Sequence, residues 1–177
     1  MIKGFLITVI GLFIMITIIS LFIPSKINTV KSVVIHAKEN KISNEISDLL
    51  NWRNWQPVFK EEVDKIKISN PSSGKNAFAE WISNAKTSQV KIIESNKNYT
   101  KFLLKQQGQK DIENIISISP VDDSTAWQVQ WQSITYLKWY PWEKFAGIFI
   151  EKMTGPGYEA SLNGLKNYLE NNINQAN

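Results

Sequence analysis

Twenty consecutive uncharged residues near the start of the chain limit its possible folds more than any other feature. The run is GFLITVIGLFIMITIISLFI, residues 4–23, and its only polar side chains are hydroxyls. A bilayer core of about 30 Å is crossed by roughly 20 apolar residues of helix. Pro24 follows directly and ends the run. The run therefore predicts a transmembrane helix.

The competing interpretation of this run is a cleaved signal peptide. Such a peptide has a shorter apolar core, of about 7 to 15 residues, followed by a small-x-small cleavage site. The residues SLFIPSK, 20–26, contain no such site. We therefore expect a retained single-pass membrane anchor in residues 1–25 and one folded domain in residues 26–177. Lys3 precedes the run and Lys26 and Lys31 follow it, so the charge balance favours an extracytoplasmic domain only slightly.

Composition excludes several classes of function. The 177 residues suffice for one ordinary domain with an appendage. The absence of cysteine excludes disulfides, thiol nucleophiles and thiolate metal sites. The net charge of +4 comes from dispersed lysines and a single arginine, Arg53. Readers of nucleic acid concentrate basic residues on one face and favour arginine, so we expect no nucleic-acid partner.

Most of the chain after the run has the pattern of β-strands. Residues 26–37 are rich in β-branched side chains and predict a first strand. Between residues 64 and 137, clusters of Pro, Ser, Gly, Asn and Asp separate further strand-like segments at intervals that suit antiparallel hairpins. Six strands are expected there, near 64–69, 77–84, 88–96, 99–107, 111–119 and 125–137.

Helical spacing appears in two places. Residues 38–52 carry Ile42, Ile46 and Leu49 at helical intervals, before a tryptophan-rich corner that Pro57 interrupts. Near the end of the chain, apolar residues recur at three and four positions through 142–153 and again through 158–173. Gly155, Pro156 and Gly157 predict a kink or short break between these two runs.

A terminal helix with an apolar stripe must bury that stripe against another element. An antiparallel sheet leaves one face open to water and offers the other for packing. The expected architecture is therefore α+β, with a curved antiparallel sheet wrapped around the terminal helix.

Four segments carry a resemblance to a known family. They are PSKINTVKSVVIHA at 24–37, ISDLLNWRNWQPV at 46–58, STAWQVQW at 124–131, and the run at 141–169 from Pro-x-x-x-Phe-x-Gly to Leu-Lys-x-Tyr-Leu. Together they resemble the polyketide cyclase/dehydrase-like branch of the START/Bet v 1 (SRPBCC) superfamily, especially bacterial members with an amino-terminal membrane helix. The resemblance implies a helix-grip fold, in which a seven-stranded antiparallel sheet surrounds the C-terminal helix and leaves a ligand cavity. Carriers, receptors and enzymes share this fold, so it does not by itself select a function.

The sequence offers few groups for catalysis. His36 is the only histidine, which excludes a two-histidine metal site and leaves no spare imidazole for a catalytic triad. Glu80 lies beside Trp81 on a predicted strand and would serve as an acid or base only if buried. The Asp122-Asp123 pair fits a hairpin turn. We therefore predict no catalytic residues, no metal and no cofactor.

Large apolar side chains alternate with polar ones on the predicted strands, so one face of the sheet should look inward at the terminal helix. Such a face either forms a plain core or lines a pocket for a flat or acyl ligand. The candidate pocket residues are Trp81, Phe102, Leu104, Ile116, Trp127, Val129, Trp131, Tyr158, Leu162 and Leu165. The leading hypothesis is noncatalytic binding of a small hydrophobic molecule, lipid-like or polycyclic. A cyclase, dehydratase or hydrolase using a polar group in the cavity, and an interaction module with a filled core, are the alternatives.

The segment YLKWYPWEKF, residues 136–145, is crowded with aromatic side chains where the last strand ends. Its rings either seal one end of the sheet or, if they are exposed beside the anchor, lie at the membrane interface.

The apolar run generates a prediction about fractionation. Full-length protein should sediment with membranes, whereas residues 26–177 should be soluble, because the apolar run is confined to residues 4–23 and the remainder has a mixed charged surface. Centrifugation of both forms after expression checks this. Unprocessed full-length protein in the soluble fraction would contradict the anchor.

Overall fold

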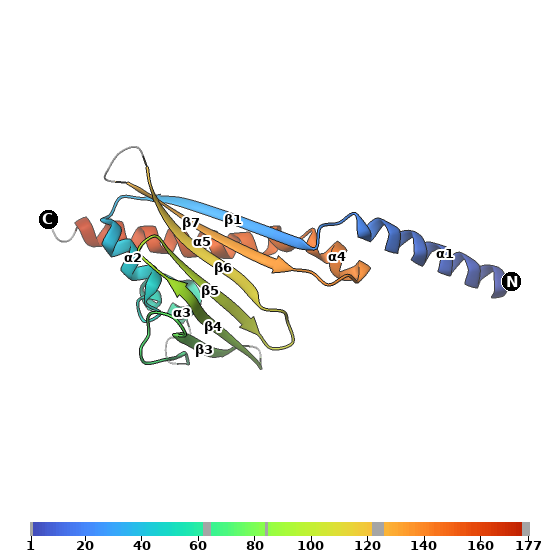
Figure 1. The fold of residues 1–177 in the computed structure, drawn as a ribbon, viewed down its shortest axis with the longest axis horizontal. Coiled ribbons are helices and arrows are strands. Elements are labelled where there is room, and N and C mark those ends of the chain that lie inside the picture. The colour runs from blue at the N-terminus through green and yellow to red at the C-terminus, as the bar shows by residue number, and fades with distance from the viewer. Residues whose placement is uncertain (1, 62–64, 84, 122–125, 175–177) are drawn as a thin grey trace.

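The structure is a computed structural model that describes residues 2–61, 65–83, 85–121 and 126–174. Helix α1 (Ile2–Leu21) precedes strand β1 (Lys26–Ile35), helix α2 (Glu39–Ser47), the short 3₁₀ helix η1 (Asn51–Asn54) and helix α3 (Pro57–Glu61). Six strands follow: β2 (Lys67–Ile68), β3 (Phe78–Ser83), β4 (Lys86–Ser95), β5 (Tyr99–Gln106), β6 (Ile112–Pro120) and β7 (Trp127–Tyr136). Helices α4 (Pro141–Gly147) and α5 (Ile150–Asn174) close the chain (Figure 1).

The strands form one seven-stranded antiparallel sheet in the order β1-β7-β6-β5-β4-β3-β2. Strands β2 to β7 follow one another as a meander. Strand β1 joins the sheet beside β7, with which it pairs over its whole length. The α+β class, the seven strands and the long C-terminal helix predicted from the sequence are confirmed. The strand predicted at 64–69 is shorter than expected: β2 has two residues, and residue 64 lies outside the described residues.

Alternation along the strands decides which face of the sheet is buried. On β7, Val129, Trp131 and Ser133 are buried, whereas Gln128, Gln130 and Gln132 between them are partly exposed. The outer face is polar and carries ion pairs such as that between Lys101 Nζ and Glu113 Oε2, 3.6 Å apart. The inner face therefore packs inward while the outer face meets water, as the period of two requires.

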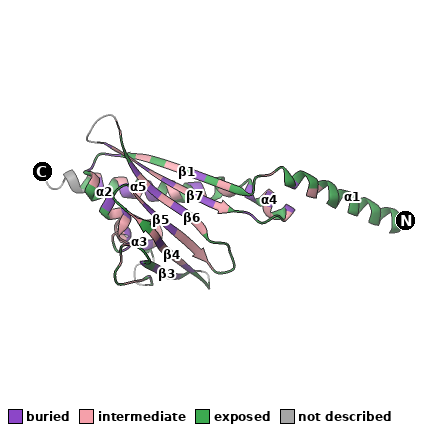
Figure 2. Cartoon of the chain, in the orientation of Figure 1, coloured by how far each residue is buried: buried purple, intermediate pink, exposed green. Residues whose placement is uncertain are grey.

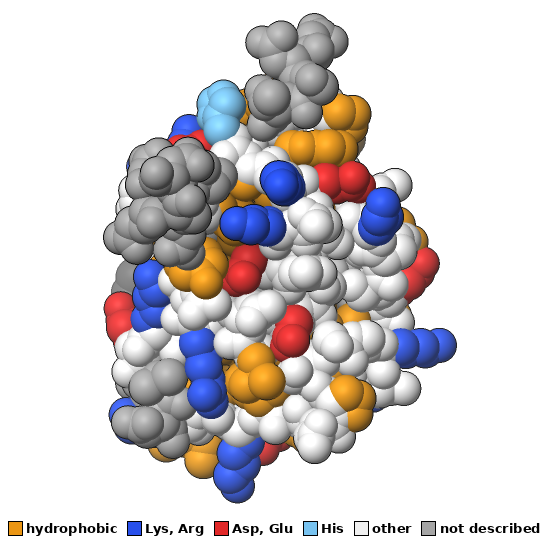
Figure 3. Space-filling view, turned by 90° about the vertical axis from the view of Figure 1, so that its left-hand side faces the viewer, with side chains coloured by type: hydrophobic (Ala, Val, Ile, Leu, Met, Phe, Trp, Pro, Cys, Tyr) orange, Lys and Arg blue, Asp and Glu red, His pale blue; other side chains and the backbone are white. Residues whose placement is uncertain are grey.

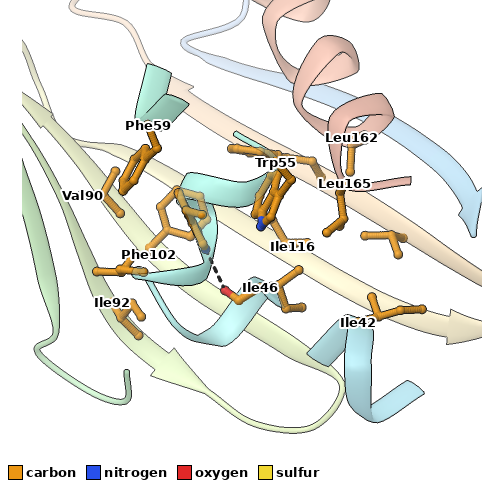
Figure 4. Packing of buried hydrophobic residues seen from close by; sticks show 14 of the residues in the cluster. Ile42, Ile46, Trp55, Phe59, Val90, Ile92, Phe102, Ile116, Leu162 and Leu165 are labelled. Atoms are coloured by element: carbon orange, nitrogen blue, oxygen red, sulfur yellow. Dashed lines mark hydrogen bonds between the residues drawn. The ribbon is translucent and has the colours of Figure 1, made fainter. Parts of the chain in front are cut away.

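Helix α5 lies along the inner face of the sheet, and its stripe of Leu162, Leu165 and Leu169 is buried. Figure 4 shows Leu162 and Leu165 of α5 close to Ile116 of the sheet and Trp55 of η1. Ile42 and Ile46 of α2 complete this part of the core, and both are fully buried. The terminal helix is thus an internal element of the fold.

The tryptophan-rich segment differs from the sequence prediction. Pro57 does not interrupt a corner but begins α3, where its missing N–H is not needed. Trp52 and Trp55 are almost completely buried. Trp52 Nε1 donates to the Ile46 carbonyl and Trp55 Nε1 to the Glu45 carbonyl, each at 3.2 Å. These two bonds fasten η1 to the end of α2.

The short break predicted at Gly155–Gly157 is wrong. Helix α5 continues through Pro156, and the interruption lies at Ile148 and Phe149, between α4 and α5. Pro156 is exposed. The carbonyl that its missing N–H leaves free can therefore bond to water, which lowers the cost of proline inside the helix.

Helix α1 extends away from the rest of the molecule (Figure 1) and is exposed along nearly its whole length (Figure 2). It is long and apolar enough to cross a membrane, and only 6% of its apolar window is buried. The apolar core helix of a soluble protein would be mostly buried, so that interpretation does not fit. A membrane span and a signal sequence both satisfy this test of length and composition.

Leu165 tests the role of α5 in the fold. Its side chain is fully buried. Leu165→Ala should lower the free energy of unfolding of residues 26–177 by roughly 2 to 5 kcal/mol, because it removes buried methyl groups and leaves a cavity. Urea denaturation measures the loss, with the half-exposed Leu50→Ala as control. A loss within about 0.5 kcal/mol, as at a surface site, would contradict the packing of α5.

Gly164 tests the close approach of α5 to η1. A Cβ atom there would lie 2.3 Å from the Trp55 carbonyl oxygen, whereas a Cβ at Gly157 on the same helix meets nothing within 4 Å. Alanine favours a helix over glycine by about 1 kcal/mol. We therefore expect Gly157→Ala to be neutral or stabilising, and Gly164→Ala to cost roughly 1 to 3 kcal/mol through overpacking. Equal effects in urea denaturation would refute the close approach.

Candidate functional site

A cavity of about 420 Å³ lies between the inner face of the sheet, α3 and the first half of α5. Small-molecule sites in proteins commonly enclose about 300 to 1,000 Å³. The cavity is lined by Trp52, Gln56, Pro57, Val58, Phe59, Trp81, Ser88, Val90, Phe102, Leu104, Gln106, Asn114, Trp131, Gly157, Tyr158, Ala160 and Ser161. Gly157 and Ala160 are exposed and Val58 is partly buried, so the mouth lies between α3 and α5.

The sheet wall comes from alternate residues on neighbouring strands. Leu104 pairs with Val90, and Gln106 pairs with Ser88 across the β4–β5 register. Asn114 on β6 faces Phe102 on β5. Because side chains on paired positions point to the same face, these residues form one continuous surface.

Aromatic rings meet at the floor of the cavity. The Trp52 ring lies 5.1 Å from the Phe102 ring and 5.3 Å from the Phe59 ring, measured between centroids. The Trp131 ring lies 5.7 Å from Phe102 and 5.1 Å from Tyr158. These distances and the tilted or edge-to-face geometries are those in which aromatic pairs attract each other. The floor is therefore a connected cluster of rings.

The α5 wall is made of small residues except for one ring. Gly157, Ala160 and Ser161 line the cavity, and Tyr158 is the large side chain among them. Directly after Ser161 on α5, Leu162, Leu165 and Leu169 fill the interior completely. The cavity exists where the helix presents small side chains to the tryptophans, and it ends where leucines replace them.

Polar groups on the wall fall into two sets. Trp131 Nε1 donates to Asn114 Oδ1 at 3.0 Å, and Tyr158 Oη donates to Ser133 Oγ at 2.9 Å. The Ser161 hydroxyl donates to the Gly157 carbonyl. The side chains of Ser88 and Gln106, by contrast, make no hydrogen bond within the described ranges 2–61, 65–83, 85–121 and 126–174. Ser88, Gln106 and the amide N–H₂ of Gln56, whose Oε1 accepts a hydrogen bond from the Phe59 N–H at 2.9 Å, are therefore the groups available to a ligand.

The cavity wall carries no Asp, Glu, Lys, Arg or His among the residues that the structure describes. Glu80 is half-buried, accepts a hydrogen bond from Gln89 Nε2 at 3.3 Å and lies outside this wall. His36 is exposed at the far end of β1, where its Nδ1 lies 3.3 Å from Glu170 Oε1. Asp122 and Asp123 lie outside the described residues. The wall thus holds no carboxylate or imidazole for proton transfer.

Two titratable groups with a clear pKa shift also lie away from the cavity. Burial raises the pKa of Glu45 on α2, against a smaller opposing effect of its hydrogen bond from Asn54. A hydrogen bond to Glu94 raises the pKa of Tyr99, which is partly exposed at the start of β5. Neither residue lines the cavity.

The structure places five of the ten candidate pocket residues in the cavity wall: Trp81, Phe102, Leu104, Trp131 and Tyr158. Ile116, Val129, Leu162 and Leu165 lie in the filled part of the core. Trp127 packs against that core and is only partly buried. These five residues therefore belong to the packed core next to the cavity and do not line it.

Sequence reasoning missed the wall formed by η1 and α3. Trp52, Trp55 and Phe59 follow one another at intervals of three and four, which is helical spacing. That signal was available, but Pro57 between them suggested a broken corner. The small residues of α5 carried no signal of their own, because a gap in packing appears only when the opposite wall is known.

The aromatic segment at 136–145 exposes its two tryptophan rings to solvent. Trp139 and Trp142 are 70% and 64% exposed, so they do not seal the sheet, and α4, which carries Trp142, lies next to α1. Of the two expectations from the sequence, the exposed position beside α1 is the one observed. Tyr140 stacks on Trp142 with 5.0 Å between ring centroids.

Comparison with solved structures identifies the fold. No family model and no curated protein matches the sequence. A START superfamily protein from Mycobacterium smegmatis matches 81% of this chain and 97% of its own, with a TM-score of 0.58 and 15% identity. CalU16 from Micromonospora echinospora matches 84% of this chain and 79% of its own, with a TM-score of 0.57 and 11% identity. The Aha1 protein from Colwellia psychrerythraea matches 81% and 96%, with a TM-score of 0.55 and 12% identity.

These likenesses show that the chain has the START-like fold, with the sheet and long C-terminal helix of the helix-grip architecture. At such low identities they show the fold alone, and the fold is shared by proteins of many functions.

Proposed function

We propose that this protein is a membrane-anchored, noncatalytic binding domain for a small hydrophobic molecule held between the sheet and α5. The observation that carries the proposal is the cavity of about 420 Å³, with its aromatic floor and its lack of charged side chains among the described residues. Ligand sites are typically concave, mostly apolar and supplied with a few polar groups that fix orientation. The START-like fold is consistent with such a ligand-binding role.

The lining suggests the class of ligand. Trp52, Phe102 and Trp131 present ring faces and edges that suit a flat polycyclic body or an acyl chain. Ser88 and Gln106 could hydrogen-bond one polar group at the end of such a molecule. A strongly charged ligand does not fit, because it would lose its hydration without gaining an opposite charge. The ligand class is therefore apolar with at most one neutral polar end.

The anchor supports a membrane source for the ligand. Residues 1–25 would hold the domain 26–177 at a bilayer, with the domain extracytoplasmic as the charge balance slightly favours. Leu104, Gln106, Ser88 and Asn114 line the cavity near the sheet end that also holds Lys26, the first residue of β1. This part of the sheet wall therefore lies on the α1 side of the sheet, and the proposed exchange of the ligand with the bilayer would take place from that side.

The two alternatives have less support. An interaction module with a filled core would not need the cavity. A cyclase, dehydratase or hydrolase would need a proton donor or acceptor beside the ligand. The wall offers Tyr158, whose hydroxyl is already committed to Ser133, and no carboxylate or imidazole among the described residues.

Blocking the cavity mouth tests the proposal. A fluorescent fatty alcohol and aminoanthracene, both neutral, should each change tryptophan fluorescence in residues 26–177 and raise the melting temperature. A ligand at a hundredfold excess over Kd stabilises the folded state by about 2.7 kcal/mol. Ala160→Trp places a ring over the exposed mouth and should abolish both effects.

The matched control is Glu159→Trp, one position along α5, exposed and outside the cavity wall. It should bind the probes like the unmodified domain. If neither probe changes fluorescence or melting in the unmodified domain, the binding proposal is wrong. Equal loss in both variants would place the probe elsewhere.

A further inference from the structure

The junction between α4 and α5 carries an unusual concentration of exposed apolar side chains. We name this surface the elbow patch, and it consists of Trp139, Trp142, Ile148, Phe149 and Met153. Each side chain is between 58% and 77% exposed. Soluble surfaces seldom gather large apolar side chains in one place unless another surface covers them. The interruption of the helix at Ile148 and Phe149 turns these two residues outward.

A buried lysine fixes the elbow patch to the base of α1. Lys144 on α4 is 5% exposed. Its Nζ donates to the Ile23 carbonyl at 2.7 Å and also to the Ser25 hydroxyl. The Leu137 N–H, in the aromatic segment 136–145, donates to the Ser25 carbonyl at 2.8 Å. The short connection from α1 is therefore held on two sides by the elements that carry the patch.

The length of that connection limits what can lie against the patch. Only Phe22, Ile23, Pro24 and Ser25 separate the end of α1 at Leu21 from the start of β1 at Lys26. At no more than about 3.6 Å per residue, this segment spans less than roughly 18 Å when fully extended. A bilayer entered by α1 must then lie directly beside α4, which Figure 1 shows at the base of α1.

The opposite end of the molecule has a different surface. Figure 3 views that end and shows lysine, arginine and acidic side chains scattered among polar ones, with small separated hydrophobic groups. The exposed apolar side chains of the elbow patch are large, and all five fall between residues 139 and 153. This asymmetry is the one expected if the α1 end meets lipid and the other end meets water.

We propose that the elbow patch inserts into the headgroup and outer acyl region of the same bilayer that α1 crosses. This inference rests on the membrane anchor of the proposed function. Trp and Tyr rings favour this interfacial depth because they have an apolar body and a polar edge. The stacked rings of Tyr140 and Trp142 and the exposed Trp139 provide them.

The charges around the patch fit the same depth. Lys138 and Lys152 are exposed beside the patch, and long lysine side chains reach up to the phosphates while their stems stay in apolar surroundings. Glu143 and Glu151 lie on the same two helices, so the patch has no strong net charge. Insertion therefore depends mainly on the apolar side chains and only weakly on anionic lipid.

The absence of cysteine makes a depth measurement direct. Phe149→Cys places one environment-sensitive fluorophore on the patch, and Leu50→Cys, 48% exposed at the far end, serves as the matched control. Full-length protein is reconstituted in vesicles of phosphatidylcholine with a minor share of phosphatidylglycerol. Lipids carrying a nitroxide near the headgroup should quench the label at 149 several-fold more than the label at 50.

A second pair of proteins separates the patch from the anchor. With the label at Met153→Cys, the double variant Trp142→Ser/Phe149→Ser should lose most of the quenching at 153. It should still float with the vesicles, because α1 is unchanged. The double variant must also melt at the temperature of the parent, which its exposed positions predict.

Three results would overturn the inference. If the protein floats with vesicles but the labels at 149 and 50 are quenched equally, the patch does not insert and the anchor stands. If the labels at 149 of two copies instead quench one another at high protein density, the patch is covered by a second copy. If full-length protein does not float, the anchor itself is wrong, and the inference falls with it.

Discussion

The close contact between α5 and η1 determines how the interior of the domain is divided. Gly164 lets the helix approach until only a hydrogen atom fits between its Cα and the Trp55 carbonyl oxygen. On the C-terminal side of this contact, Leu165 and Leu169 fill the space against α2 and the sheet. On the N-terminal side, beyond the buried Leu162, the helix presents Gly157, Ala160 and Ser161, and the space stays open. The C-terminal part of α5 therefore fills the space against the sheet, whereas its N-terminal part forms one wall of a cavity.

The open half keeps its shape because its rings are held from behind. Trp52 and Trp55 are fixed by hydrogen bonds to the end of α2, and Trp131 is fixed by Asn114. A cavity whose wall is already ordered costs a ligand less conformational entropy than one that must form on binding. The same hydrogen bonds satisfy the polar atoms of the floor, which leaves an apolar surface facing the ligand. Preorganisation and apolarity thus have a common origin in these contacts.

Strand alternation and the leucine stripe of the terminal helix were enough to predict the sheet and the helix across it, because both patterns reflect burial on one face. The two-residue strand β2 was overestimated because a short edge strand has almost no pattern of its own. The pocket was half predicted. Residues such as Phe102 and Trp131 belong to strands with an alternating pattern, which predicts their inward side chains. Trp52 and Phe59 belong to η1 and α3, which were not predicted because Pro57 was interpreted as an interruption and not as the start of a helix. The boundary between pocket and core depends on which residues of α5 are small. The sequence does not show this boundary, because small residues leave a cavity only where the aromatic rings of the opposite wall face them.

The cavity mouth and the elbow patch are connected along α5 for a topological reason. Strand β1 starts shortly after α1, and its antiparallel pairing with β7 brings Tyr136, and with it the aromatic segment, back to that end. Helix α5 starts directly after Ile148 and Phe149 of the elbow patch, its first turn carries Met153, and the next turns, at Gly157 and Ala160, border the cavity mouth. From Met153 to Gly157 the helix rises only about 6 Å, at 1.5 Å per residue. If the patch lies in the headgroup region, the mouth opens within a few ångströms of it, and an apolar ligand can move between bilayer and cavity without crossing bulk water, where its exposed surface would be costly.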